Sequence, residues 1–166
     1  MEKRIRDLYL AMSEFDRERP DLIQHFTKVH AYAALIAECE GLDVHTCEIL
    51  QAAALVHDIA IPLCDQKYGS HPGPLQEQEG PALVRSLLSD MDFTETEINR
   101  ICTLVGKHHT LSPIDGIDHQ ILLEADFLVN CFSHSNPRDS LEHTLRHVIA
   151  TATGKRLFTA MFGLEE

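Results

Sequence analysis

The sequence is poor in the residues that break regular structure and in positive charge. Glycine and proline together make up 15 of its 166 residues, below the roughly 12% of average usage, which argues against a turn-dense all-β sandwich. Lysine and arginine number 14 against 26 aspartates and glutamates, a formal net charge of −12. Because such a balance repels phosphate backbones and anionic lipid headgroups, we expect no nucleic-acid polymer and no membrane surface among the partners.

A targeting segment, a membrane-spanning segment and a cysteine-pair motif are also missing. Charged residues are spread over the first twenty positions, and the most apolar window, Ile49 to His57, lacks charge for only nine residues. A spanning helix needs roughly 20. The five cysteines are scattered and form no C-x-x-C pair, so we interpret them as reduced core thiols and expect a cytoplasmic protein.

Apolar residues at helical spacing dominate what is present. They make up 44% of the chain, with 24% charged residues, close to globular averages. No convincing period-two pattern of a strand is found. We therefore predict an all-α fold: a single domain over residues 1–166, built as a bundle of about seven helices, with a core at about 22–132 and flanking helices at 1–18 and 136–166.

The expected helix ends follow from caps and helix-breaking residues. Pro62 prevents extension of the third helix, Thr94 and Glu97 form a capping box, and Gly154 ends the last long helix. The predicted helices cover Glu2–Arg17, Leu22–Glu40, Asp43–Asp58, Leu75 or Pro81 to Asp90, Thr94–His109, Ile121–Phe132 and Asn136–Thr153, followed by a short tail helix. A long loop is expected at Ile59–Gly73, and such loops often border sites. The flanking helices could cover the domain or form a homodimer contact.

Eleven histidines invite a metal hypothesis, although most have an ordinary explanation. His143 and His147 lie four residues apart, yet each is two residues, about 200° around the helix, from a member of the apolar stripe, so both should face water. Five others lie at expected helix starts or in loops and are interpreted as surface residues: His25, His45, His71, His119 and His134.

Four ionisable residues stand where the periodicity predicts burial. His30 shares the apolar face of its helix, His57 and Asp58 end a hydrophobic run, and Asp126 lies within the most apolar helix. Each of these residues, taken alone, has an ordinary explanation. A core histidine can donate a hydrogen bond to a backbone carbonyl, and a buried aspartate can cap a helix or pair with an arginine. A buried carboxylate is unfavourable unless it is paired or bound to a metal. Taken together, one divalent cation would satisfy all four.

These residues resemble the H…HD…D signature of the HD-domain superfamily of metal-dependent phosphohydrolases. The stretch AALVHDI, which ends around Asp58, resembles the central motif, and LEADFLV, around Asp126, resembles the segment of the final aspartate. The matching part runs from about Leu22 to Phe132. The resemblance implies an all-helical bundle whose core helices carry the metal ligands His30, His57, Asp58 and Asp126.

Further matches concern a second metal. The pair His108-His109 resembles an additional histidine element of many members, and it implies ligands for a second ion. Members with two metals usually have one more histidine shortly before a glycine, where this chain has Glu77, three residues before Gly80. That departure leaves open whether one ion or two bind.

The expected chemistry follows from this donor set. Imidazoles and carboxylates suit a divalent transition metal such as Fe, Mn, Co, Ni or Zn. We expect hydrolysis of a phosphate ester of a nucleotide or other small molecule by metal-bound hydroxide. Asp58 would be both a ligand and the residue that orients the water, Glu77 or Glu79 would relay a proton, and Lys107, with Lys67 and Arg85 as further candidates, would supply positive charge.

Two alternatives stay open. One is a di-iron, O₂-dependent oxygenase of the HD fold, which needs a fuller set of ligands for the second metal. The other is a non-catalytic module that senses nucleotides, in which the metal site is kept and turnover is lost.

Overall fold

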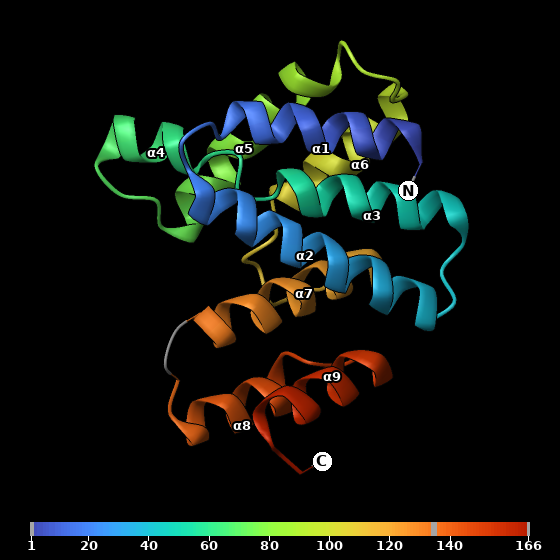
Figure 1. The fold of residues 1–166 in the computed structure, drawn as a ribbon, viewed down its shortest axis with the longest axis vertical. Helices are drawn as coiled ribbons and strands as arrows, with labels where there is room; N and C mark the ends of the chain where they lie inside the picture. Colours follow the sequence, from blue (N-terminus) through green and yellow to red (C-terminus); the bar gives the residue numbers. More distant parts are fainter. Residues whose placement is uncertain (1, 134–135, 166) are drawn as a thin grey trace.

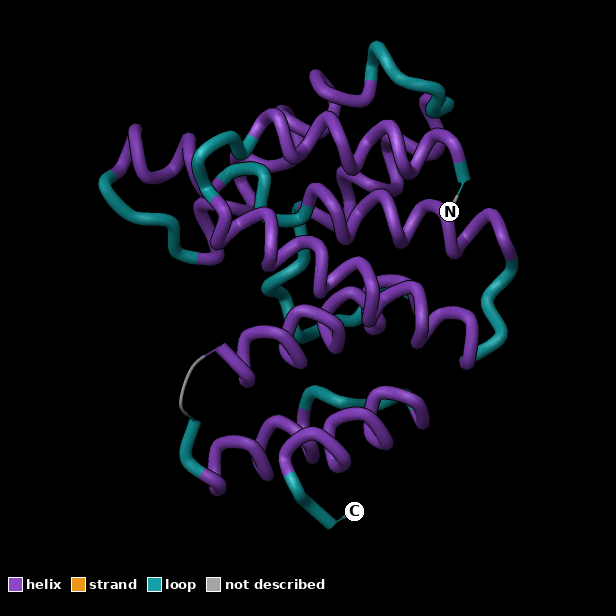
Figure 2. The backbone as a smooth tube through the Cα atoms, viewed as in Figure 1, coloured by secondary structure: helices purple, strands orange, loops and turns teal. Residues whose placement is uncertain are grey.

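The computed structural model describes residues 2–133 and 136–165, and every regular element in these ranges is a helix (Figure 2). The prediction of an all-α fold is confirmed. The described chain has nine helices rather than about seven, arranged as in Figure 1: α1 (Lys3–Phe15), α2 (Pro20–Cys39), α3 (Val44–Val56), α4 (Ile61–Tyr68), α5 (Gly73–Leu88), α6 (Glu95–Val105), α7 (Ile117–Ser133), α8 (Arg138–His147) and α9 (Ala152–Phe162).

The core lies where α2, α3 and α7 meet. Helix α2 makes its most extensive contacts with α7 and α3, and α3 is buried almost all round over its second half. Alanines at the contacts, such as Ala33 of α2 and Ala53 of α3, are fully buried and let the helix axes approach closely. Helix α1 covers this core with Ile5, Leu8 and Met12, each at most 1% exposed.

The expected loop at 59–73 contains a helix. Pro62 lies in the first turn of α4, where a missing N–H breaks no helical hydrogen bond. The backbone N–H of Ile61 donates to the carbonyl of Asp58 at 2.9 Å, so a tight turn of backbone separates α3 from α4. Gly69 ends α4 with a φ of 73°. The proline therefore separates two helices instead of starting a loop.

The single helix expected at 136–153 is wrong, because the chain breaks it into α8 and α9 after His147. Thr151 is the N-cap of α9, and its hydroxyl accepts a hydrogen bond from the N–H of Gly154 at 2.9 Å. Gly154 therefore lies in the first turn of a new helix and does not end the old one.

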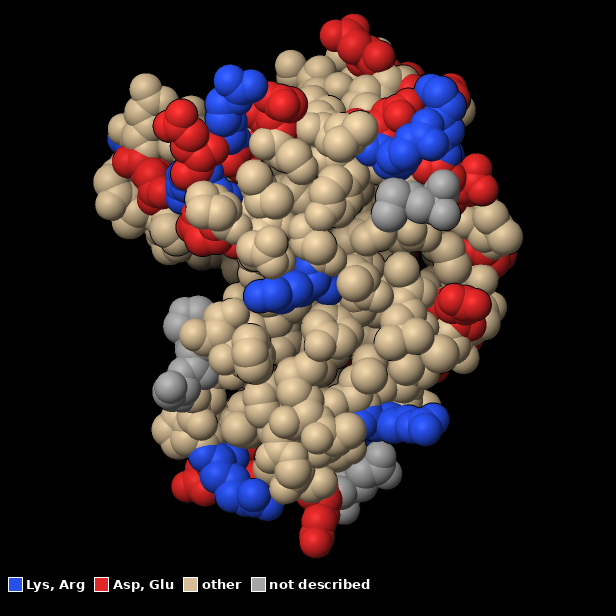
Figure 3. Space-filling model, viewed as in Figure 1, with Lys and Arg blue, Asp and Glu red and all other residues tan. Residues whose placement is uncertain are grey.

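Charged side chains are unevenly spread over the surface seen in Figure 3. They gather over α1, α4 and α5 and around α8. In this view the surface is hollowed at the left edge, between α4 and α5 above and α7 and α8 below. One stretch, Val44–Tyr68, is long and apolar enough to cross a membrane, but 67% of its apolar window is buried inside the fold. It is accordingly a core element of this bundle.

Candidate metal centre

The end of α3 places His57 and Asp58 at the centre of the bundle. His57 is fully buried, and its Nδ1 donates to the carbonyl of Ala54, three residues earlier, at 2.9 Å. That hydrogen bond fixes the tautomer and leaves a lone pair on Nε2. The turn into α4 brings the carboxylate of Asp58 to the same side, with Oδ2 3.4 Å from His57 Nε2. Two neighbouring residues thus present ligand atoms to one point.

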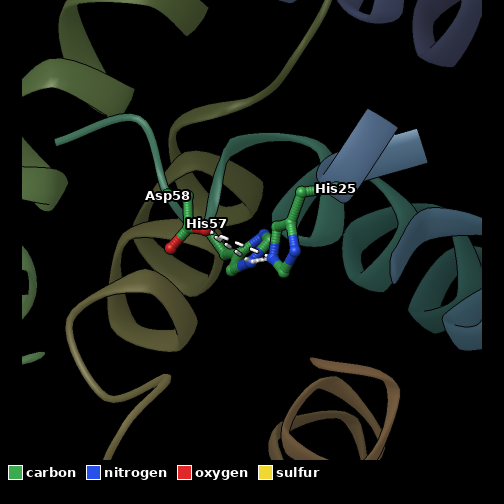
Figure 4. A group of neighbouring side chains, drawn as sticks. All are labelled: His25, His57 and Asp58. Atoms are coloured by element: carbon green, nitrogen blue, oxygen red, sulfur yellow. Dashed lines mark hydrogen bonds and ion pairs between the residues drawn. The ribbon is translucent and has the colours of Figure 1, made fainter. Parts of the chain in front are cut away.

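Helices α2 and α7 bring His25 and Asp126 to this point. His25 Nε2 lies 3.0 Å from His57 Nε2, 3.2 Å from Asp58 Oδ2 and 3.1 Å from Asp126 Oδ1. Figure 4 shows the side chains of His25, His57 and Asp58 pointing toward one another. Asn130, one turn further along α7, donates to Asp126 Oδ1 at 2.8 Å and holds its orientation.

His108, in the turn after α6, adds a nitrogen without a protein partner. Its Nδ1 donates to the carbonyl of Val105 at 2.7 Å, so Nε2 again carries a lone pair. This buried Nε2 accepts no hydrogen bond from the described part of the chain, and it lies 3.5 Å from Asp58 Oδ1. A buried lone pair that no protein donor satisfies is unfavourable. A cation between His108 and Asp58 would satisfy it.

The donor atoms fit one or two metal ions. Ligand atoms of His25, His57 and Asp58 all lie within 4.8 Å of one another, and so do those of Asp58, His108 and His109. Asp58 belongs to both groups. The donors in these two groups are imidazole nitrogens and carboxylate oxygens, and neither group contains a cysteine thiolate. Such a donor set suits divalent transition metals. We name these residues, together with Asp126, the metal centre.

The two buried carboxylates of the metal centre, Asp58 and Asp126, require positive charge beside them. Burial acts to raise the pKa of Asp126, but the hydrogen bond from His25 and the charge of His57 outweigh it, and the pKa lies below its usual range. Burial likewise acts to raise the pKa of Asp58, but the charges of His57 and His108 outweigh it and hold this pKa well below its usual range. Burial opposes protonation of His57, yet both carboxylates raise its pKa well above the ordinary value. The carboxylates thus stay ionised, and a proton or a metal must balance them.

His30 does not lie in this centre, so the expected histidine of α2 is corrected to His25. The two are five residues apart, which places them about 140° apart around the helix. His30 Nε2 contacts Oε1 of Gln51 at 3.2 Å, and its ring meets the edge of Tyr9. Burial lowers the pKa of His30. The sequence did hold a signal: His25 lies only about 40° from buried Val29, and α2 begins earlier than expected, at Pro20.

Glu77 and Lys107 are engaged outside the ligand cluster. Oε1 of Glu77 accepts from the backbone N–H of His109 and from the hydroxyl of Thr110, both at 2.9 Å. Glu77 thus holds the turn that carries His109, and its role as a proton relay stays a prediction. The amine of Lys107 donates to Asp115 at 2.8 Å, so its charge is already paired.

The other expected charges are also paired. Glu79 accepts from the amine of Lys67 at 2.8 Å and from the hydroxyl of Tyr68 at 2.5 Å. Arg85 donates to Glu95 at 2.9 Å. Neither these groups nor Lys107 makes a hydrogen bond to the metal centre within the described residues.

Most of the remaining histidines lie as expected. His143 and His147 are exposed, which confirms the face assigned to them, and their rings lie 4.4 Å apart. The expectation for His119 is wrong, because it is fully buried: Nε2 donates to the carbonyl of Lys107 at 2.8 Å and Nδ1 accepts from the N–H of Asp115 at 3.0 Å. His119 thereby ties down the loop that follows the His108 turn. His134 lies outside the described residues.

Glu124 shows that a buried carboxylate on α7 need not bind a metal. It is fully buried two residues before Asp126, where its Oε1 accepts from the backbone N–H groups of Ala150 and Thr151 at 2.7 and 2.8 Å. Its other oxygen accepts from the hydroxyl of Thr151 at 2.5 Å. Glu124 thus caps a neighbouring helix, the role that sequence alone left open for Asp126.

Asp16, in the turn between α1 and α2, is a buried carboxylate that the sequence pattern did not reveal. It is 4% exposed, and its buried Oδ1 has no hydrogen-bond partner among residues 2–133 and 136–165. Burial raises the pKa of Asp16 to about 6; the charge of Arg19 opposes the rise and that of Asp58 adds to it. The turn that carries Asp16 therefore lies within electrostatic reach of the metal centre.

Comparisons with known proteins identify the fold. No protein-family model and no curated protein matches the chain. The chain is similar to the crystal structure of a predicted HD superfamily hydrolase from an uncultured Thermotogales bacterium, with a TM-score of 0.69 and 21% sequence identity. The match covers 95% of this chain and 84% of the other. This likeness shows that the chain shares its fold with that predicted HD superfamily hydrolase.

Proposed function

We propose that the protein is a metal-dependent hydrolase that acts on phosphate esters of nucleotides or other small molecules. The observation that carries the proposal is the convergence of His25, His57, Asp58 and Asp126, together with the unpartnered Nε2 of His108. A divalent metal held by these residues would polarise a phosphoryl oxygen and lower the pKa of water for attack.

The residues of the centre have distinct roles in this proposal. Nδ1 hydrogen bonds to backbone carbonyls hold the His57 and His108 rings with Nε2 directed at the ligand position. Asp58 belongs to both groups of ligand atoms, so it is the residue best placed to orient a nucleophilic water. Glu77 fixes the turn that carries His109. The two carboxylates would repel a phosphate in the absence of a cation, so substrate binding depends on metal loading.

The similar crystal structure is that of a predicted hydrolase, and this likeness favours hydrolysis over the oxygenase alternative. An oxygenase needs a fuller ligand set for a second iron, and one oxygen of Glu77, Oε1, already accepts hydrogen bonds from the backbone of His109 and the hydroxyl of Thr110. The second alternative is a module that binds nucleotides without hydrolysing them. An assay of turnover distinguishes such a module from a hydrolase.

The test combines elemental analysis with turnover. Purified protein loaded with Mn²⁺, Fe²⁺ or Co²⁺ is assayed against phosphomonoesters, cyclic nucleotides and dinucleoside polyphosphates. We expect release of phosphate or of a nucleoside phosphate from at least one class, abolished in Asp58→Ala. Loaded protein that turns over none of them would overturn the proposal, and consumption of O₂ would favour the oxygenase.

Two histidines of one helix provide a matched pair for the ligand assignment. His25→Ala should lose bound metal, whereas His30→Ala should retain it, because only His25 Nε2 reaches Asp126 and Asp58. Metal content is measured after dialysis against a fixed free-metal concentration. Loss of metal in His30→Ala with retention in His25→Ala would reverse the assignment.

A further inference from the structure

Few positive charges are free to meet an anionic ligand. Eleven of the 14 lysines and arginines, all within the described residues, form an ion pair with an aspartate or glutamate. The three for which no such pair is found among the described residues are Lys28, Lys155 and Arg156. Of these, Lys28 lies on α2 three residues after His25. In a chain with a net charge of −12, an unpaired cation one helical turn from the metal centre is notable.

Lys28 borders a groove where α2, α7 and α9 meet. The cavity has a volume of about 310 Å³ and is lined by Lys28, Tyr32, Leu128, Val129, Phe132 and Met161. This is the lower end of the range of roughly 300 to 1,000 Å³ for small-molecule sites. Phe132 is 68% exposed, and the amine of Lys28 lies 5.9 Å from the centre of its ring. The groove therefore offers an accessible aromatic face beside one positive charge.

The groove adjoins the metal centre along two helices. Lys28 follows His25 by three residues on α2, and Val129 follows Asp126 by three residues on α7. Three residues are nearly one turn and about 4.5 Å along the helix axis. His25 and Asp126 contact each other at 3.1 Å. Because α2 and α7 run in opposite directions (Figure 1), the two steps diverge along the helix axes, and the groove lies beside the metal centre, within one turn of it on each helix.

We propose that this groove binds the aromatic base of a nucleoside phosphate, with Lys28 neutralising the phosphate between the groove and the metal centre. The inference rests on the proposed function, which places the phosphate at the metal. An aromatic face with aliphatic walls suits a planar base, and loss of an aromatic stacking partner weakens base binding roughly 5- to 100-fold. A single lysine suits a phosphate as a point charge.

Adenosine tests the groove separately from the reaction, because it carries no phosphate to hydrolyse. Its binding to metal-loaded protein is measured by isothermal titration calorimetry. We expect Phe132→Ala to weaken adenosine binding about tenfold or more. The matched control Leu10→Ala removes another exposed apolar side chain, 60% exposed on α1, and should leave binding unchanged.

Lys28 is tested with adenosine 5′-phosphate. Lys28→Ala should raise the KM several-fold with kcat within about twofold, since the interaction is made with both ground state and transition state, and it should leave adenosine binding unchanged. The matched control Arg156→Ala removes another exposed cation, on α9. It should change neither the KM for adenosine 5′-phosphate nor the binding of adenosine.

The outcomes separate this proposal from the proposed function. Adenosine binding that depends on Phe132 in a protein without turnover would support the groove and refute the hydrolase. Turnover of adenosine 5′-phosphate with adenosine binding insensitive to Phe132→Ala would overturn the groove. If Phe132→Ala instead dissociates a wild-type dimer in sedimentation velocity and leaves adenosine binding unchanged, the groove is a contact between copies of the chain and the proposal is wrong.

Discussion

Replacing Asp16 by asparagine should make the protein more stable at neutral pH and leave its stability almost unchanged near pH 4. The carboxylate is buried, and its Oδ1 has no hydrogen-bond partner. Burial first, and then the negative charge of Asp58, raise its pKa from 3.8 to about 6 against the opposing charge of Arg19. Asparagine has nearly the same shape and never carries the charge.

The sign follows from proton binding. Between pH 3.8 and about 6 the folded state binds more protons at Asp16 than the unfolded state, so stability falls as pH rises through this window. A rise in pKa from 3.8 to about 6 corresponds to at most ~3 kcal/mol lost above pH 6. The advantage of Asp16→Asn should grow from near zero at pH 4 to as much as ~3 kcal/mol at pH 7.5.

Urea unfolding followed by circular dichroism measures this difference. Both proteins are kept with a chelator, so that metal binding does not alter the charge at Asp58. The exposed Asp90, in the turn after α5, provides a control, and Asp90→Asn should show no such trend with pH. Equal effects of Asp16→Asn at pH 4 and pH 7.5, or a loss of stability at pH 7.5, would refute the reasoning.

Three further changes test other parts of the structure. Gly154→Ala would place a Cβ in steric conflict with Oε2 of Glu124, so we expect a loss of ~1–3 kcal/mol in urea unfolding; a wild-type midpoint would contradict this contact. Chelation should lower the Tm by about 5–10 °C relative to protein with metal at 100 times its Kd, and an unchanged Tm would disprove cation binding at the centre. Hydrogen bonds from Thr94 and Arg4 outweigh burial and lower the pKa of Glu97 from 4.5 to about 2. The contribution of ionised Glu97 to folding stability is thus complete above pH 4.5 and is lost as the pH falls toward 2. In acid titrations followed by circular dichroism, Glu97→Gln should therefore show a weaker dependence of stability on pH.

The sequence predicted the helices better than their ends. The all-α fold and the capping box at Thr94 follow from local periodicity and local hydrogen bonds, and both are found. The break after His147 does not follow from local preference, because it is stabilised by the carboxylate of Glu124, which comes from another helix. Tertiary contacts of this kind cannot be read from spacing alone.

The candidate site was predictable only in part, for a related reason. The hydrophobic run before His57 and the apolar helix around Asp126 indicated that both residues are buried. The structure brings His57 and Asp126 together. Periodicity could not choose between His25 and His30, because both lie on partly buried faces of α2 and only the position of α7 distinguishes them. The partners of Glu77 and Lys107 come from distant turns, so their engagement was invisible in the sequence.

The link from α7 to the last two helices bears on how this protein can be shortened. Glu124 is fully buried, and its oxygens accept hydrogen bonds from residues 150 and 151. A fragment ending near residue 133 would keep every residue of the metal centre but would strip Glu124 of those donors and leave an uncompensated charge against the hydrophobic interior. The segment that bears the signature residues is therefore smaller than the unit that folds, which extends through α9 to the core residues Phe158 and Leu164.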